Sequence, residues 1–186
     1  LEFRRVLFRS LRGLAKRIRQ QTSGNPFFIE EVVRAFVENG SLQGHRGAYR
    51  LARAVEDVIL PPTVHGVLAA RIDRLSERDK RVLETAAVIG KRFAESLLLA
   101  AIGEPAGDLS ASLHALGEAG FIDHVQSYPE IEYAFHHPLT QEVAYRQQLA
   151  SRRSEIHRKV AEALEADCCA TNKDRSEEHT SELQSP

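Results

Sequence analysis

The histidine pair at residues 136–137 is the clearest group in this chain that could do chemistry. Two histidines could hold a metal ion, but neighbouring side chains at the end of a strand point in opposite directions. No cysteine or carboxylate accompanies the pair at the spacing of a metal site. The pattern therefore favours a hydrogen-bonding role, and it makes His136 a surface residue at the edge of its element.

The rest of the sequence contains no recognisable catalytic arrangement. A Gly-x-x-x-x-Gly-Lys-Ser/Thr loop is absent, so the chain lacks the backbone cradle and the hydroxyl that hold a nucleotide phosphate and its magnesium ion. Cys168 and Cys169 are adjacent, which argues against a disulfide framework and is typical of a reducing cytoplasm. We expect no activity from this chain by itself.

A Gly-Asn-Pro run at residues 24–26 predicts a junction between two helices. Gly24 can take the left-handed conformation that ends a helix, Asn25 is a good N-cap, and Pro26 suits the first helical position. The glutamates at 30–31 follow where the helix dipole favours negative charge. One apolar face of the second helix is made by Phe28, Val32, Ala35 and Phe36. On these residues alone, a helix–loop–helix and a binding loop are both open.

The run and the helix that follows it resemble the Gly-x-Pro motif of the STAND class of signalling ATPases, which are relatives of AAA ATPases. In that family the proline belongs to the helical lid and packs against the adenine of bound ADP or ATP. The resemblance implies that Pro26, together with Gly24 and Asn25, contacts the nucleotide. The segment is similar to regulators in which the ATPase is joined to a cyclase, a kinase or a LuxR-type DNA-binding domain.

Pro61-Pro62 predicts a domain boundary, and residues 41–60 before it read as a loop with short strand-like pieces. After the boundary, apolar periodicity and caps predict helices and strands in a definite order. The helices cover residues 63–75, 76–89, 93–101, 108–119, 138–148 and 151–165, and the strands cover 121–125 and 131–135. Helices followed by one hairpin predict a mainly α fold with a winged-helix domain over residues 61–148.

This order also resembles the STAND family, in which a winged helix follows the lid and helical repeats follow the winged helix. The phrase from Tyr133 to Tyr145 is similar to the family's closing signature, in which a histidine opens the last winged-helix segment. The resemblance implies that His137 donates a hydrogen bond to the β-phosphate of ADP and holds the lid and the winged helix closed. The alternative is that His137 satisfies a backbone carbonyl at the end of the hairpin.

The predicted organisation has three native parts. Residues 11–60 are the end of the lid, residues 61–148 are the winged helix, and residues 149–174 begin a helical repeat region. In the lid, a basic helix over 11–22 turns one apolar face inward, formed by Leu11, Leu14, Ala15 and Ile18. In the repeat region, the apolar stripe is formed by Ile156, Val160, Ala163 and Leu164.

The two ends of the chain look non-biological. Residues 175–184 are one translation of AGATCGGAAGAGCACACGTCTGAACTCCAG, the string of a sequencing-library adapter, and residues 1–10 translate its reverse complement. We therefore expect residues 1–10 and 175–186 to be adapter-derived and to pack poorly on the rest. The chain also contains no methionine, so we expect an internal fragment of a longer protein.

Charge and composition limit the expected partners. The net charge is −1, and the expected recognition helix at 108–119 contains no Lys or Arg, so we expect no nucleic acid as a partner. No apolar run approaches membrane-spanning length, so we expect no membrane contact. The expected function is the non-catalytic switch portion of a cytoplasmic ATPase, closing over ATP or ADP and Mg²⁺ bound by an upstream domain. The repeats could bind other proteins. The alternatives are a DNA-binding winged-helix regulator and a helical interaction scaffold.

Overall fold

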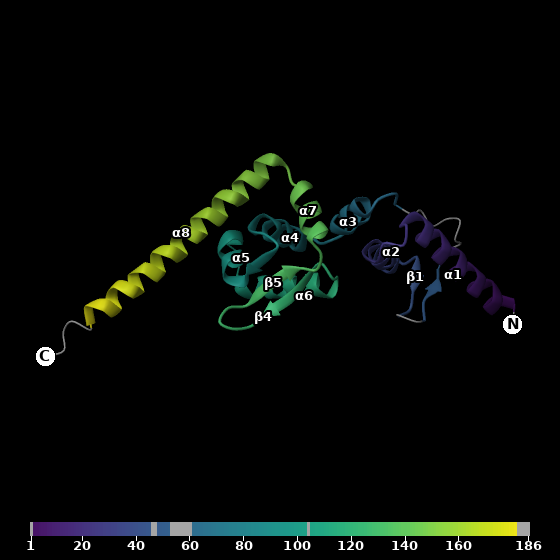
Figure 1. Ribbon diagram of the computed structural model, residues 1–186, viewed down its shortest axis with the longest axis horizontal. Coiled ribbons are helices and arrows are strands. Elements are labelled where there is room, and N and C mark those ends of the chain that lie inside the picture. Colours follow the sequence, from purple (N-terminus) through teal and green to yellow (C-terminus); the bar gives the residue numbers. More distant parts are fainter. Residues whose placement is uncertain (1, 46–47, 53–60, 104, 182–186) are drawn as a thin grey trace. The chain divides into compact units, whose positions relative to one another are not determined.

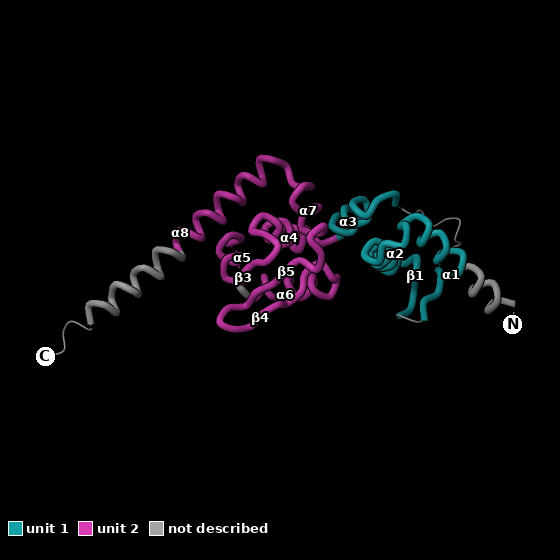
Figure 2. Tube along the Cα trace, viewed as in Figure 1, with its two compact units in different colours: residues 1–74 teal, residues 75–186 magenta. Residues whose placement is uncertain are grey.

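The computed structural model describes residues 2–45, 48–52, 61–103 and 105–181 (Figure 1), and it describes only the backbone at residues 2–10, 106 and 167–181. The chain is 64% helix, with eight helices and small antiparallel sheets in the described part, as the sequence predicts for a mainly α fold. Contacts divide the chain into two compact units, residues 1–74 and residues 75–186 (Figure 2). The expected poor packing of the two adapter-like ends concerns side chains outside the described residues.

In its described part, unit 1 contains three helices and one short hairpin. In chain order its elements are α1 (Glu2–Gln21), α2 (Pro26–Glu38), β1 (Leu42–Gln43), β2 (Arg50–Leu51) and α3 (Val64–Ile72). The strands β1 and β2 pair in antiparallel register, which agrees with the predicted strand-like pieces, whereas residues 53–60 lie outside the described part. The core is built from Leu14, Ile18, Phe28, Val32, Ala35, Phe36, Leu42 and Val67.

The apolar face predicted for α1 is correct except at one position. Leu14 and Ile18 are buried, and Leu11 packs against the same core. Ala15 is exposed, and the buried position one turn beyond Ile18 is Thr22, whose hydroxyl donates to the Ile18 carbonyl at 2.8 Å. The small alanine side chain gains little from burial, so the larger residues decide which way the helix faces.

The third helix of unit 1 lies beyond the boundary that the sequence predicted. Thr63 caps α3 as expected, because its hydroxyl accepts a hydrogen bond from the Gly66 amide at 3.1 Å. However, α3 packs on α2, and the contacts divide the chain after Arg74 rather than at Pro61. The double proline therefore stands inside unit 1, before a helix that completes its core.

Unit 2 combines five helices with a three-stranded sheet in its described part. Its elements are α4 (Glu77–Ile89), β3 (Arg92–Ala94), α5 (Glu95–Ile102), α6 (Ala106–Glu118), β4 (Ile122–Gln126), β5 (Glu132–Phe135), α7 (Pro138–Arg146) and α8 (Ala150–Ser181). The sheet is antiparallel, with strand order β3-β5-β4. Ser76 caps α4 as predicted, accepting from the Asp79 amide at 3.1 Å.

The prediction of a helix over residues 93–101 was wrong at its start. Residues 92–94 form strand β3, which pairs with β5 so that Phe93 lies opposite Tyr133. The two rings stack with their centroids 6.0 Å apart. The predicted single hairpin is therefore two strands of a three-stranded sheet. A three-residue strand shows no alternation of its own, and only its pairing with a distant segment defines it.

Helices cover the sheet and form the core of unit 2. Leu109, Leu113 and Leu116 of α6 point inward as predicted, each at most 2% exposed. Ile156 and Val160 of α8 pack with Val88 and Ala101. Leu164, predicted on the same stripe, is 47% exposed, because an apolar stripe is buried only as far as its neighbours extend. No helix in the described part of the chain is long and apolar enough to cross a bilayer.

Candidate functional site

The Gly-Asn-Pro loop is a tight junction whose bonds follow from its residue types. Ser23 and Gly24 both have positive φ, 50° and 76°. The Gly24 amide donates to the Arg19 carbonyl at 3.2 Å, and the Ser23 amide donates to the Gln20 carbonyl at 3.5 Å. This is the Schellman pattern, in which Ser23 holds the left-handed position that glycine usually takes. Gly24 adopts the predicted left-handed conformation one residue later.

The next helix begins at the position that the sequence predicts. The Asn25 side chain accepts a hydrogen bond from the Phe28 amide at 3.1 Å, and Pro26 is the first helical residue. Gly24, Asn25 and Pro26 are all exposed. The loop therefore presents a fixed, exposed proline ring above an anchored helix start, while Phe28 is buried beneath it.

A buried ion pair that the sequence did not predict stabilises this helix. Arg71 of α3 is 1% exposed, and its guanidinium donates to Glu31 and, at 2.8 and 2.6 Å, to Glu38 of α2. Burial alone lowers the pKa of Arg71, but the hydrogen bonds and charges of Glu38 and Glu31 outweigh it and raise that pKa. Arg71 is therefore a permanent cation that ties α3 to α2.

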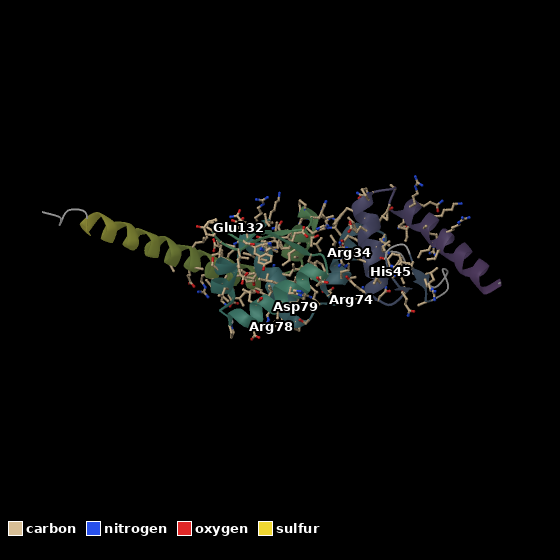
Figure 3. The ribbon with its side chains drawn as sticks, turned by 90° about the horizontal axis from the view of Figure 1, so that it is seen from below. Arg34, His45, Arg74, Arg78, Asp79 and Glu132 are labelled. Carbon is tan, nitrogen blue, oxygen red and sulfur yellow. The ribbon has the colours of Figure 1, made fainter. Side chains whose placement is uncertain are left out.

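One sequence signal for this cluster was available. Glu31 lies three residues after Phe28, inside the arc of apolar positions, where a charge needs a partner. The glutamates at 30 and 31 consequently have different roles. Glu30 is exposed and pairs with Arg34 at 2.8 Å on the outer face of α2, where Figure 3 labels Arg34. Glu31 is buried, so its role is to pair with Arg71 inside unit 1 rather than to support the helix dipole.

His137 is the N-cap of α7. Its Nδ1 accepts a hydrogen bond from the Leu139 amide at 3.1 Å, and the backbone is extended at φ −142°. An imidazole that accepts at Nδ1 carries its proton on Nε2 when neutral. The cap therefore selects the tautomer in which Nε2 is the donor. The bond found here runs from a backbone amide to the ring, so it differs from the carbonyl contact that the sequence left open.

Three other histidines of unit 2 are exposed. His136 is exposed, and its Nδ1 lies 2.8 Å from a carboxylate oxygen of Asp123. His124 packs edge-on against Tyr133, with ring centroids 5.5 Å apart. His114 is exposed on α6. Among the described residues, no group of three or more His, Cys, Asp or Glu side chains could hold a metal ion.

The expected binding residues fall in both units. Gly24, Asn25 and Pro26 share one loop of unit 1, whereas His137 opens a helix of unit 2. Each unit alone thus presents one half of the expected nucleotide contact. A search against known protein families found no match to this chain, and a search of curated proteins found none.

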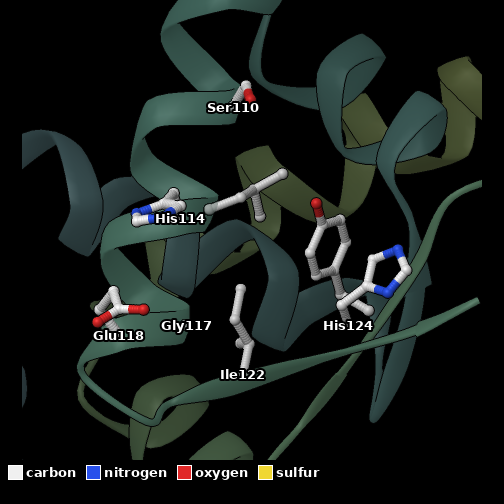
Figure 4. A pocket seen from close by; sticks show the side chains of 8 residues that line it. Ser110, His114, Gly117, Glu118, Ile122 and His124 are labelled. Atoms are coloured by element: carbon white, nitrogen blue, oxygen red, sulfur yellow. The ribbon is translucent and has the colours of Figure 1, made fainter.

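Unit 2 also has a shallow pocket that the sequence did not reveal (Figure 4). Its volume is about 280 Å³, and it lies between α6 and the strands β4 and β5. Ser110, His114 and Glu118 follow one another along α6, and Ile122 and His124 come from β4. Tyr133 of β5 completes the wall.

The Tyr133 hydroxyl stays protonated. Burial raises the pKa of Tyr133, and the neighbouring Glu95 carboxylate raises it further by its charge and by a hydrogen bond. The hydroxyl donates to that carboxylate at 3.3 Å. The pocket wall therefore contains a neutral phenol next to an anionic residue.

Proposed function

We propose that this chain is the lid end and the winged helix of a STAND-type signalling ATPase, and that it acts as a nucleotide-dependent switch. The observation that carries the proposal is the exposed Pro26, fixed at the first position of a capped helix by the Gly24-Asn25 turn. A rigid apolar ring with no N–H fits the face of a purine base. The residues present thus fit the adenine, while the phosphate loop belongs to a domain outside this sequence.

The arrangement of unit 2 supports the second half of the proposal. Its chain order of helix, strand, two helices and hairpin supports a winged-helix assignment, as does the sheet order, in which β5 lies between β3 and β4. His137 follows directly after β5 and opens α7, and its cap selects the Nε2–H tautomer. We assign that N–H to the β-phosphate of ADP.

In this proposal ADP stabilises a closed state in which both units contact one nucleotide. Pro26 contacts the base and His137 donates to the phosphate, so loss of either contact weakens the closed state. A ligand can shift such an equilibrium only through its different affinity for the two states. Exchange of ADP for ATP together with a signal then releases the closed state. A cytoplasmic location follows from this use of nucleotide.

The gene itself offers a direct test. We expect the source DNA upstream of the Leu11 codon to continue in frame and to encode a Gly-x-x-x-x-Gly-Lys-Ser/Thr loop. Long-range amplification from the source sample would recover this region. A start codon immediately upstream, with no such loop, would contradict the proposal.

A DNA-binding regulator is the competing reading, because a winged helix often places its third helix in the major groove. Here that helix is α6, which contains no Lys or Arg. Phosphate contacts need cations, so we expect no salt-sensitive binding of duplex DNA at micromolar concentrations of this chain. Fluorescence anisotropy with a labelled duplex measures this directly, and binding that Ser110→Glu and His114→Glu in α6 abolish would favour the competing reading.

A further inference from the structure

Positive charge is absent from a long central segment of the chain. Residues 93–145 contain no Lys or Arg, yet they contain eight acidic residues. This segment includes β4, β5 and all of α6. Apart from histidines, the charged side chains that these elements contribute are therefore all acidic, in a chain whose net charge is only −1.

The pocket between α6 and the two strands combines an apolar floor with a polar rim. Leu113 and Ile122, both nearly fully buried, form the apolar lining. Gly117 has no side chain, so it leaves space for a ligand along the surface of α6. The Glu118 carboxylate and the Ser110 hydroxyl lie at the rim. A lysine or arginine side chain has the matching shape, because its stem is apolar and its end is cationic.

Glu118 stands where its own helix disfavours a negative charge. It is the last residue of α6, at the negative end of the helix dipole. At the opposite end of the helix, Asp108 pairs with Arg78 at 3.0 Å. Within the described residues, no Lys or Arg pairs with Glu118. Water solvates this exposed carboxylate, so a cation from another molecule would pair with it without displacing a cation of this chain.

Next to the pocket, the β4–β5 hairpin presents exposed apolar side chains. Val125, Tyr128 and Ile131 are 42%, 86% and 40% exposed. The hairpin end is tied to the start of α5, because the Glu95 amide donates to the Ile131 carbonyl at 2.9 Å and Ser96 donates to Glu130. An exposed tyrosine on an anchored turn is a typical binding hot spot, since little entropy is lost when it is covered.

We propose that the face formed by α6 and the β4–β5 hairpin binds a basic segment of a partner protein, with one Lys or Arg side chain in the pocket beside Glu118. The acidic, partly apolar surface carries this assignment because it complements a basic segment in charge and repels nucleic acid. The proposal concerns unit 2 alone and does not depend on the nucleotide switch.

The test measures binding of a fluorescent octa-arginine peptide to the full chain. Fluorescence anisotropy reports the affinity at low and at high salt. Glu118→Gln should weaken binding roughly tenfold, the effect of losing one charged hydrogen bond. Gly117→Leu fills the pocket without removing charge, and it should weaken binding at least as much. Glu162→Gln on α8, whose carboxylate pairs with Arg158, is the matched control and should change binding less than twofold. Circular dichroism verifies that each variant is folded.

Three results would overturn the proposal. An equal loss of peptide affinity in Glu162→Gln and Glu118→Gln would show that the peptide is attracted to any acidic part of the protein. Unchanged binding in Gly117→Leu would show that the pocket is not used. Tighter binding of a labelled DNA duplex than of the peptide, under the same conditions, would assign the surface to nucleic acid. Weaker peptide binding in both Glu118→Gln and Gly117→Leu, with unchanged binding in the control variant, supports the proposal that the pocket holds a basic side chain.

Discussion

At the scale of single residues, the most consequential side chain in unit 1 is Arg71. Its guanidinium is buried away from water and donates hydrogen bonds to two carboxylates of α2, those of Glu31 and Glu38. Such a cluster is worth little relative to an apolar core, but it is very sensitive to the loss of one member. Exposed pairs such as Arg34 with Glu30 behave differently, because water solvates either partner when the other is removed.

Replacing Arg71 by methionine should therefore lower the free energy of unfolding of unit 1 by about 3–5 kcal/mol, since Glu31 is left buried without its cation. Urea unfolding followed by circular dichroism measures this change. Arg34→Met is the matched control and should cost no more than about 1 kcal/mol. Equal costs for the two variants would show that the buried cluster does not stabilise unit 1.

In the turn before α2, two glycine-related substitutions should change the free energy of unfolding in opposite directions. Ser23 holds a left-handed conformation at φ 50° that costs a non-glycine residue about 1 kcal/mol, so Ser23→Gly should raise stability by up to that amount. Gly24→Ala should lower stability by about 1 kcal/mol, because Gly24 has φ 76°. Urea midpoints of the two variants decide the matter. A loss of stability in Ser23→Gly would contradict the assignment of the turn.

At the scale of elements, a glutamine in α7 and a second one just after it join this part of the chain to α4. Gln141 donates to the Ala87 carbonyl at 2.8 Å, and Gln148 donates to the Glu84 carbonyl at 2.9 Å. Ala87 lies in the last turn of α4, where carbonyls lack a helical partner, whereas Glu84 lies inside the helix. Gln148 also donates to the Ala144 carbonyl at 3.1 Å, in the last turn of α7. Buried Oε1 of Gln148 has no partner among the described residues.

We expect Gln141→Leu to destabilise unit 2 by about 1 kcal/mol, because the Ala87 carbonyl loses its donor. Gln148→Leu should change the stability by less than about 1 kcal/mol, because the lost donor to the Ala144 carbonyl is offset by removal of a buried oxygen that has no partner. Thermal unfolding of the two variants provides the comparison. A larger loss in Gln148→Leu than in Gln141→Leu would contradict this account.

Helix starts were predictable because their causes are local. Asn25, Thr63 and Ser76 each form the predicted cap, since a cap and its partner lie within three residues. Strand β3 and the Arg71 cluster were missed because their partners are distant in sequence: Phe93 meets Tyr133, and Arg71 meets Glu31. Gly24, Asn25 and Pro26 lie in an exposed loop and His137 caps a helix, but any relation of these residues across the two units depends on long-range structure, which local patterns do not determine.

At the scale of the whole molecule, the proposed switch needs both units. The proline loop belongs to unit 1 and the histidine cap belongs to unit 2, and residues 73–76 join α3 of the first unit to α4 of the second. A nucleotide that contacts both halves would stabilise one state of the pair. The central claim is therefore that one nucleotide is shared by Pro26 and His137.

Calorimetric titration of ADP into the full-length protein that contains this segment tests that claim most directly. His137→Asp keeps an acceptor for the Leu139 amide but removes the Nε2 donor, and His136→Asn is the neighbouring control. The account predicts that His137→Asp weakens ADP binding at least ten- to a hundred-fold, since a hydrogen bond to a charged group is worth about 1.5–3 kcal/mol. His136→Asn should change the affinity less than twofold. Unchanged ADP affinity in His137→Asp, or a loss only in His136→Asn, would contradict the account and leave His137 as a helix cap alone.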